Sequence, residues 1–377
     1  MAAQHQHYVP QLLLRGFLSR DPAKAAKDQV HVFDLEAGTQ FTPSITNIMG
    51  ERRYNDFWVD EETLATVEPA AGRIESHVAP LVDRIRAEKH LERSPEETRD
   101  LALLMAFQFI RTKKMRLLPE RMSQQLREQV ERMGFDPAKV EGLEPLDEET
   151  LKRLHVRNQI DGLEKYAKII AEKEFFLMLA PQGSTFYLGD HPVVLHNDEE
   201  RRWIFGGLGL AVPYIQIYLP LSADLLLCAY DKAVLGQLMK IRDEGMRENQ
   251  IYALGKLMRG EITAAHMKRR LDAMKAFDVT TPLIDAIRAG KPIAVGPEQV
   301  QCYNSLQAFQ AHRFVVDPDG KFVVASEMMK DRKEAAEQHV AGRRELTFEG
   351  AETDKSPKAA HPERAKKVAK SSPRASL

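Results

Sequence analysis

The chain has 377 residues and a mass of 42.8 kDa; 43% of the residues are hydrophobic and 29% are charged. This is the composition of a folded globular protein, and it excludes collagen-like, coiled-coil and wholly disordered chains. Lysine and arginine total 54, aspartate and glutamate total 55, and the net charge is -1. Such a chain has no overall positive field to attract a nucleic-acid backbone, which leaves only a local basic groove for that role.

The cysteines and the apolar stretches of the sequence indicate the cellular compartment in which the protein is expected. Cys228 and Cys302 are far apart in the sequence and show no metal-binding spacing. Two thiols in a chain of this size suggest a reducing compartment. The N-terminus lacks the pattern of a secretory signal, and the most apolar stretch, residues 101–110, is about half the ~20 residues that a membrane crossing requires. We therefore expect a cytoplasmic protein with no membrane contact.

The first predicted elements are a short helix and a hairpin. Pro10 favours extended backbone before it and can open a helix over residues 11–18. Residues 29–35 alternate between apolar and polar side chains, and a turn containing glycine separates them from residues 40–42. This pattern predicts a β-hairpin.

Helices are expected next. Ser94, Pro95 and Glu97 form a helix-start signal, in which Ser94 caps the helix and Glu97 reaches back in a capping box. That helix is predicted to run to about residue 114. Further helices are predicted over residues 119–133, 147–171, 231–289 and 297–311.

The remaining predicted elements are strands. Residues 174–180 and 185–188 are predicted to form a hairpin, which residues 192–195 could extend. Two more strands are predicted over residues 214–219 and 225–229. A closing hairpin is predicted from residues 312–316 and 321–324. The order of hairpin, helices, strands, helices and hairpin favours the α+β class over a doubly wound parallel sheet. We expect a largely helical body with antiparallel hairpins in a small sheet.

The domain organisation follows from composition. Residues 1–349 are predicted to form one α+β domain, with a subdivision near residue 172 as an alternative. Residues 350–377 have almost no large apolar side chains and are rich in lysine and arginine. Such a stretch cannot bury enough surface to offset the entropy of ordering, so we predict a disordered basic tail. The tail either has no role or contacts acidic partners or nucleic acid.

The predicted helix over residues 101–112 carries an unusual pair of polar residues. It is apolar nearly all round, which indicates burial, yet Gln108 and Arg111 lie three apart on one face. A buried guanidinium needs an acid, a phosphate or a bound anion to offset its desolvation. A structural salt bridge near the helix end is the alternative to a ligand site.

Two further segments offer candidates for chemistry. His7, ahead of the helix that Pro10 opens, could act as a base, a metal ligand or a phosphate contact, or could simply bond to nearby backbone. Asp190 lies in a tight turn between β-type segments, where it is the natural partner for Arg111 or a metal ligand beside a histidine. Alternatively, Asp190 caps its own turn.

A stripe of amide side chains lies on the helix predicted over residues 297–311. Asn304, Gln307 and Gln310 share one face of that helix. Amides in this arrangement orient a ligand or solvate a helix surface.

These segments, in their order and spacing, resemble the family known as domain of unknown function 4238. The resemblance spans roughly residues 5–325. It is carried by His7-Tyr8-Val9-Pro10, Leu14-Arg15-Gly16-Phe17, Asn47, Arg53-Tyr54, residues 62–68, Gln108 and Arg111-Thr112 with Arg116, the turn Gly189-Asp190-His191-Pro192-Val193, and Asn304. His191 stands where the family usually has Asn and Lys113 where it often has Pro, so His191 is a poor choice for an essential ligand. The resemblance implies no established activity, but it points to the same polar positions.

Two classes of function remain open. A pocket formed by His7, Arg111 and Asp190, with Gln108 and Asn304 as ligand-binding groups, would suit a phosphoester hydrolase, and a nuclease in bacterial defence is its sharpest form. Such an enzyme would use a divalent metal, with His7 and Asp190 as candidate ligands. The alternative is a binding or sensor module without catalysis, which recognises an anionic small molecule, a nucleic acid or a protein partner. A third reading treats these residues as a polar core network that fixes the fold.

Overall fold

The computed structural model describes residues 5–197, 209–276 and 278–331. Contacts within the chain group residues 1–330 into one unit and residues 331–377 into a second. Residue 172, where a subdivision was the alternative, lies inside the first unit. The predicted boundary at residue 349 and the predicted tail over residues 350–377 lie outside the described residues.

The described chain is mostly helical with small, largely antiparallel sheets, so the predicted α+β class is confirmed. No helix among the described residues is both long enough and apolar enough to span a bilayer. The helices are α1 (Gln11–Leu14), α2 (Pro22–Ala25), α3 (Glu68–Glu88), α4 (Pro95–Ile110), α5 (Lys113–Arg132), α6 (Glu148–Ala171), α7 (Lys232–Met258), α8 (Ala264–Ala276), α9 (Thr280–Arg288) and α10 (Pro297–Gln310), with 3-10 turns η1 (Arg15–Phe17), η2 (Ile45–Asn47) and η3 (Pro137–Lys139).

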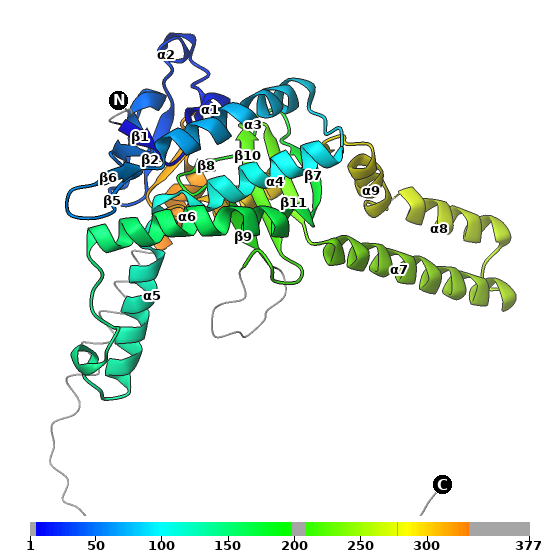
Figure 1. The fold of residues 1–377 in the computed structure, drawn as a ribbon. Helices are drawn as coiled ribbons and strands as arrows, with labels where there is room; N and C mark the ends of the chain where they lie inside the picture. Colours follow the sequence, from blue (N-terminus) through cyan, green and yellow to red (C-terminus); the bar gives the residue numbers. More distant parts are fainter. Residues whose placement is uncertain (1–4, 198–208, 277, 332–377) are drawn as a thin grey trace, which may run out of the picture. The chain divides into compact units, whose positions relative to one another are not determined.

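The largest sheet has the strand order β12-β7-β11-β10-β9. Its strands are β7 (Glu174–Leu179), β9 (Val194–His196), β10 (Gln216–Ser222), β11 (Leu225–Tyr230) and β12 (Ile293–Ala294), and only β12 runs parallel to its neighbour. Successive side chains of a strand point to opposite faces, so the sheet separates two hydrophobic clusters. Figure 1 shows α3, α4 and α6 lying across one face, where they bury Val82, Leu101 and Ile170 with Leu177 and Ile217 of the sheet.

Residues of α7, α9 and α10 cover the other face of this sheet. Leu235, Ile287 and Val300 from these helices pack with Phe176 and Tyr218 of the strands. The buried strands β10 and β11 read as nearly continuous apolar runs because both of their faces are covered.

Three smaller sheets complete the described fold. Their strands are β1 (His5–His7), β2 (His31–Asp34), β3 (Thr39–Phe41), β4 (Gly50–Arg52), β5 (Asp56–Trp58), β6 (Leu64–Thr66), β8 (Leu188–Gly189) and β13 (Phe314–Asp317). They form the pairs β1-β4 and β5-β6 and a four-stranded sheet of order β3-β2-β13-β8. The predicted hairpin of residues 29–35 and 40–42 is confirmed by the pairing of β2 with β3.

Two predicted hairpins are wrong. Strand β7 pairs with β11 and β12, whereas β8 pairs with β13. Residues 323–331 are helical instead of forming a strand opposite β13. Strands β2 and β8 already pair with both edges of β13, which leaves no edge for a hairpin partner. The turn that follows β13 is held by the Asp317 carboxylate, which accepts the backbone N–H groups of Asp319 and Lys321 at 3.0 and 2.9 Å.

The helix predicted to run from residue 95 to 114 ends earlier. Helix α4 stops at Ile110, Arg111 is its C-cap residue, and Thr112 precedes the start of α5 at Lys113. Ser94 caps α4 through a 3.0 Å bond from the Glu97 N–H, as predicted. The carboxylate of Glu97 does not close a capping box but accepts the N–H of Arg93 at 2.7 Å. Helix α3 was not predicted at all.

Candidate functional site

The guanidinium of Arg111 is enclosed at the end of α4, and the residue is only 1% exposed. It donates to Oε1 of Glu75 and to the carbonyl oxygen of His7, each at 2.5 Å. Its Cζ lies 4.4 Å from the centroid of the Phe107 ring. The carboxylate that offsets the charge of Arg111 therefore comes from α3, and the prediction that Asp190 is the partner was wrong.

The imidazole of His7 is engaged with the backbone. Its Nε2 lies 3.1 Å from the carbonyl oxygen of Ile45, and its ring lies edge-on to the ring of His5 at 5.1 Å. Burial lowers the pKa of His7, and the bond to Ile45 offsets this only in part. The observed contact is the backbone bond that sequence analysis left as the alternative for this residue.

Asp190 is fully buried and bonds to backbone in a distant part of the chain. Its carboxylate accepts three consecutive N–H groups, those of residues 312–314, at 2.6, 2.8 and 3.0 Å. Burial raises the pKa of Asp190 to about 6, because desolvation outweighs the three hydrogen bonds that favour the charged form. The carboxylate thus fastens the turn after β8 to the start of β13.

The predicted segments do meet, although through structural contacts. Arg111 reaches the carbonyl of His7, and Thr112 Oγ1 lies 2.7 Å from Nδ1 of His191, the residue after Asp190. Gln108 donates to the carbonyl of Tyr8 at 3.0 Å, and its Oε1 is buried without a partner in the described structure. Among the described residues, no three His, Cys, Asp or Glu side chains gather closely enough to hold a metal ion.

Each amide side chain of the predicted stripe on α10 accepts one hydrogen bond from a backbone N–H and donates one to a backbone carbonyl. Asn304 joins the N–H of Tyr187 to the carbonyl of Thr185, at 2.7 and 2.9 Å. Gln307 does the same for Gly189 and Pro192, both at 2.9 Å. Gln310 bonds to both backbone groups of Leu195, at 3.0 and 2.7 Å. The three side chains thus replace a neighbouring strand along residues 185–195, and all three are buried, which argues against a ligand site here.

Sequence analysis missed a polar cluster around Tyr54. The Arg116 guanidinium lies 3.5 Å from the centroid of the Tyr54 ring, and the His155 ring lies 5.9 Å from it. The Tyr54 hydroxyl donates to the carbonyl of Arg111 at 3.0 Å. Burial and, after it, the charge of Arg116 lower the pKa of His155 to about 3, so its imidazole is neutral near pH 7. The family resemblance marked Tyr54 and Arg116, whereas nothing in the sequence singled out His155.

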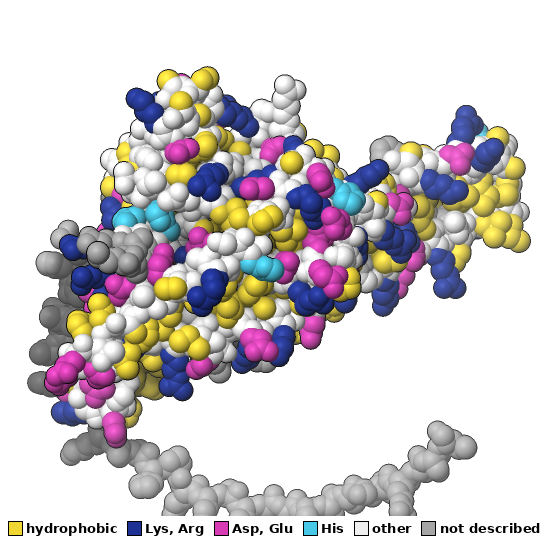
Figure 2. Space-filling model, turned by 45° about the horizontal axis from the view of Figure 1, so that its top comes forward, with side chains coloured by type: hydrophobic (Ala, Val, Ile, Leu, Met, Phe, Trp, Pro, Cys, Tyr) yellow, Lys and Arg dark blue, Asp and Glu magenta, His cyan; other side chains and the backbone are white. Residues whose placement is uncertain are grey.

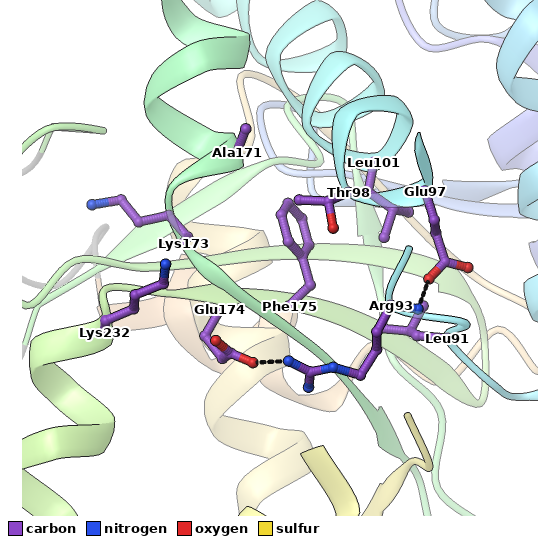
Figure 3. Close-up of a pocket in the computed structure, with 10 residues that line it drawn as sticks. All are labelled: Leu91, Arg93, Glu97, Thr98, Leu101, Ala171, Lys173, Glu174, Phe175 and Lys232. Carbon is purple, nitrogen blue, oxygen red and sulfur yellow. Dashed lines mark hydrogen bonds and ion pairs between the residues drawn. The ribbon is translucent and has the colours of Figure 1, made fainter. Parts of the chain in front are cut away.

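A cavity of about 170 Å³ opens where α4, β7 and α7 begin. Arg93 lines it from just before α4, Glu97 and Thr98 from the start of α4, Lys173 and Glu174 from the residues that lead into β7, and Lys232 from the first turn of α7. Figure 3 shows the Arg93–Glu174 pair on one side and the side chains of Lys173 and Lys232 on the other. Phe175 and Leu101 add apolar surface to the lining.

Arg93 is held firmly at this cavity. Its backbone has a left-handed conformation with φ 62°, which is uncommon for a residue with a side chain. Its N–H bonds to Glu97, and its guanidinium bonds to Glu174 and to the carbonyl of Ile287. Backbone strain of this kind persists where surrounding contacts over-determine it, and it is common at ligand sites.

The chain matches the profile of the family described as "Protein of unknown function (DUF4238)" over residues 5–321. No curated protein and no solved structure matches the chain. The matched range takes in both the polar segments and the cavity described above, and it covers well over half of the sequence. The chain therefore belongs to the DUF4238 family.

Proposed function

We propose that the protein is a binding module for a small anion and that its site is the cavity at the starts of α4, β7 and α7. The observation that supports this most strongly is that Lys232 is left without a partner once the ion pairs among the described residues at the cavity are assigned. A carboxylate or phosphate group is the natural partner for such a cation.

Most charged side chains that line the cavity are paired. The three ion pairs are Arg84 with Glu97, Arg93 with Glu174, and Lys173 with Asp231. Lys232 is exposed and makes no hydrogen bond or ion pair with any described residue. The cavity thus keeps about one unit of positive charge beside partly buried walls, where an anion gains more from the attraction than it would in open solvent.

Lys232 lies in the first turn of α7, which runs for 27 residues. The N-terminal end of a helix carries a partial positive charge, but Asp231 already caps this end, because its carboxylate accepts the N–H of Ala233 at 2.9 Å. The attraction for an anion in the cavity is therefore assigned to the side chain of Lys232.

The size of the cavity limits the ligand. A volume of about 170 Å³ equals roughly five or six water molecules, which suits a small carboxylate or phosphate. The face of the molecule in Figure 2 carries basic and acidic side chains interspersed, without a broad area of one sign. This supports a small ligand more than a nucleic acid, which favours an extended basic surface.

Isothermal titration calorimetry with inorganic phosphate and with acetate, at low ionic strength, tests the proposal. We expect saturable binding that weakens as sodium chloride is added. Lys232→Gln should weaken the affinity about tenfold, because it removes the cation that has no partner among the described residues at the cavity. Lys240→Gln is the matched control, since Lys240 is exposed on the same helix and does not line the cavity. Absence of saturable binding to the wild-type protein, or equal effects of the two substitutions, would refute the proposal.

The hydrolase hypothesis rests on different residues. It requires Arg111 and Asp190 to reach a substrate, yet both are buried, and each is bonded to protein groups. For this reason we favour binding over catalysis. Turnover of bis(4-nitrophenyl) phosphate in the presence of Mg²⁺ or Mn²⁺, compared between wild type, His7→Ala and Asp190→Ala, separates the two. Metal-dependent turnover that both substitutions abolish would favour the hydrolase.

A further inference from the structure

A second cavity, of about 290 Å³, lies between α10 and the strands β9, β10 and β11. Tyr218 and Tyr230 form its walls on the sheet, while Tyr303, Cys302 and Leu306 form its walls on α10. It shares no lining residue with the cavity proposed above for an anion. The following inference therefore does not depend on the proposed function.

The three tyrosine rings meet at angles around this cavity. The centroids of the Tyr218 and Tyr303 rings are 4.9 Å apart with an interplanar angle of 54°, and those of Tyr218 and Tyr230 are 5.7 Å apart at 87°. Rings inclined in this way do not stack fully on one another. Tyr303 is partly exposed, whereas Tyr218 and Tyr230 are only 2% and 8% exposed. A planar ligand would therefore stack mainly on the ring of Tyr303, which the other two rings hold in place.

The hydroxyl groups supply polarity without charge. The Tyr218 hydroxyl donates to Oε1 of Gln216 at 2.5 Å and lies 2.6 Å from the Tyr230 hydroxyl. Burial raises the pKa of both tyrosines far above the usual value, so both stay protonated. Among the described residues, no Lys, Arg, Asp or Glu side chain lines the cavity, although the imidazole of His196 does. A charged ligand would lose its hydration here and would meet no permanently charged side chain among these residues.

We infer that this cavity is a second binding site, and that its ligand is an uncharged, planar heteroaromatic molecule. Aromatic and aliphatic walls with a few converging polar groups are typical of small-molecule sites. The Tyr303 ring would provide stacking, and the tyrosine hydroxyls and the exposed amide of Gln299 would bond to the nitrogen and oxygen atoms on the edge of the ligand. A saturated ring of similar size has no π-face and would gain much less from the same walls.

Cys302 gives a direct assay. Cys302 is exposed at the cavity, whereas Cys228 is buried, and the chain has no other cysteine, so iodoacetamide reports on Cys302 alone in the folded protein. We expect saturating indole or adenine to slow alkylation about fivefold or more. Cyclohexanol, which lacks an aromatic ring, and benzoate, which is charged, should leave the rate unchanged. Fragment-sized ligands bind weakly, so concentrations on the order of several millimolar are required.

Two variants and a second readout complete the test. Tyr303→Leu removes one aromatic wall and should abolish the protection by indole, while Gln301→Leu, at an exposed position on the same helix, should preserve it. Saturation-transfer NMR on the same four compounds measures contact independently of the thiol. The inference is overturned if neither heterocycle binds the wild-type protein, if benzoate protects Cys302 better than they do, or if all four compounds act alike.

Discussion

Replacing Asp190 with asparagine tests whether burial or hydrogen bonding has the larger effect on the pKa of its carboxyl group. The pKa of Asp190 is about 6 in the folded protein, against 3.8 for the exposed group. The folded state therefore binds a proton more tightly than the unfolded state. The resulting stability is fully present below pH 3.8 and is lost as the pH rises through 6.

The size of this effect follows from the shift. A difference of about two pKa units corresponds to about 3 kcal/mol of unfolding free energy, of which about 1.3 kcal/mol is lost between pH 5 and pH 7. The asparagine side chain keeps one acceptor oxygen for the N–H groups of residues 312–314 but does not titrate. The Asp190→Asn protein should thus lack this contribution.

Urea denaturation of both proteins between pH 5 and pH 7 provides the measurement. Most other titrating groups are common to the two proteins and cancel in the difference between them. We expect the advantage of the wild type over Asp190→Asn to shrink by about 1.3 kcal/mol from pH 5 to pH 7. An advantage that stays constant would mean that the pKa is not raised. An advantage that grows with pH would mean that the three N–H groups outweigh desolvation, and our account of this carboxylate would be wrong.

Two further predictions concern buried polar groups. Gln307→Leu should lower the unfolding free energy, measured with urea, by about 2–4 kcal/mol, because the N–H of Gly189 and the carbonyl of Pro192 lose their partner. The control Ser305→Ala, on the same helix, should change it by less than about 0.5 kcal/mol. Equal effects of the two substitutions would contradict the strand-replacing role of α10. His155, with a pKa of about 3, contributes stability that is present above pH 6.5 and is lost as the pH falls toward 3. His155→Phe should therefore unfold at lower pH than the wild type when acid titration is followed by circular dichroism, and an unchanged midpoint would contradict the burial argument.

Local signals in the sequence predicted the elements that depend on local chemistry. The Ser94 cap fixed the start of α4, and the alternating pattern with its glycine turn identified the pairing of β2 with β3. The wrong hairpins have a common cause. Pairing between neighbouring segments was assumed, whereas β13 pairs with strands that are distant in the sequence, and no local pattern identifies such partners.

The amide stripe on α10 illustrates what the sequence does and does not contain. The spacing of Asn304, Gln307 and Gln310 correctly placed them on one face of a helix, because that depends only on helical periodicity. Which groups they bond to depends on residues 185–195, where the short strands β8 and β9 leave backbone groups that need partners. A buried backbone N–H must be satisfied from somewhere, and an amide side chain does this as well as a neighbouring strand. The same polar stripe is therefore compatible with a ligand site or with a structural role, and only the positions of the distant segments decide between them.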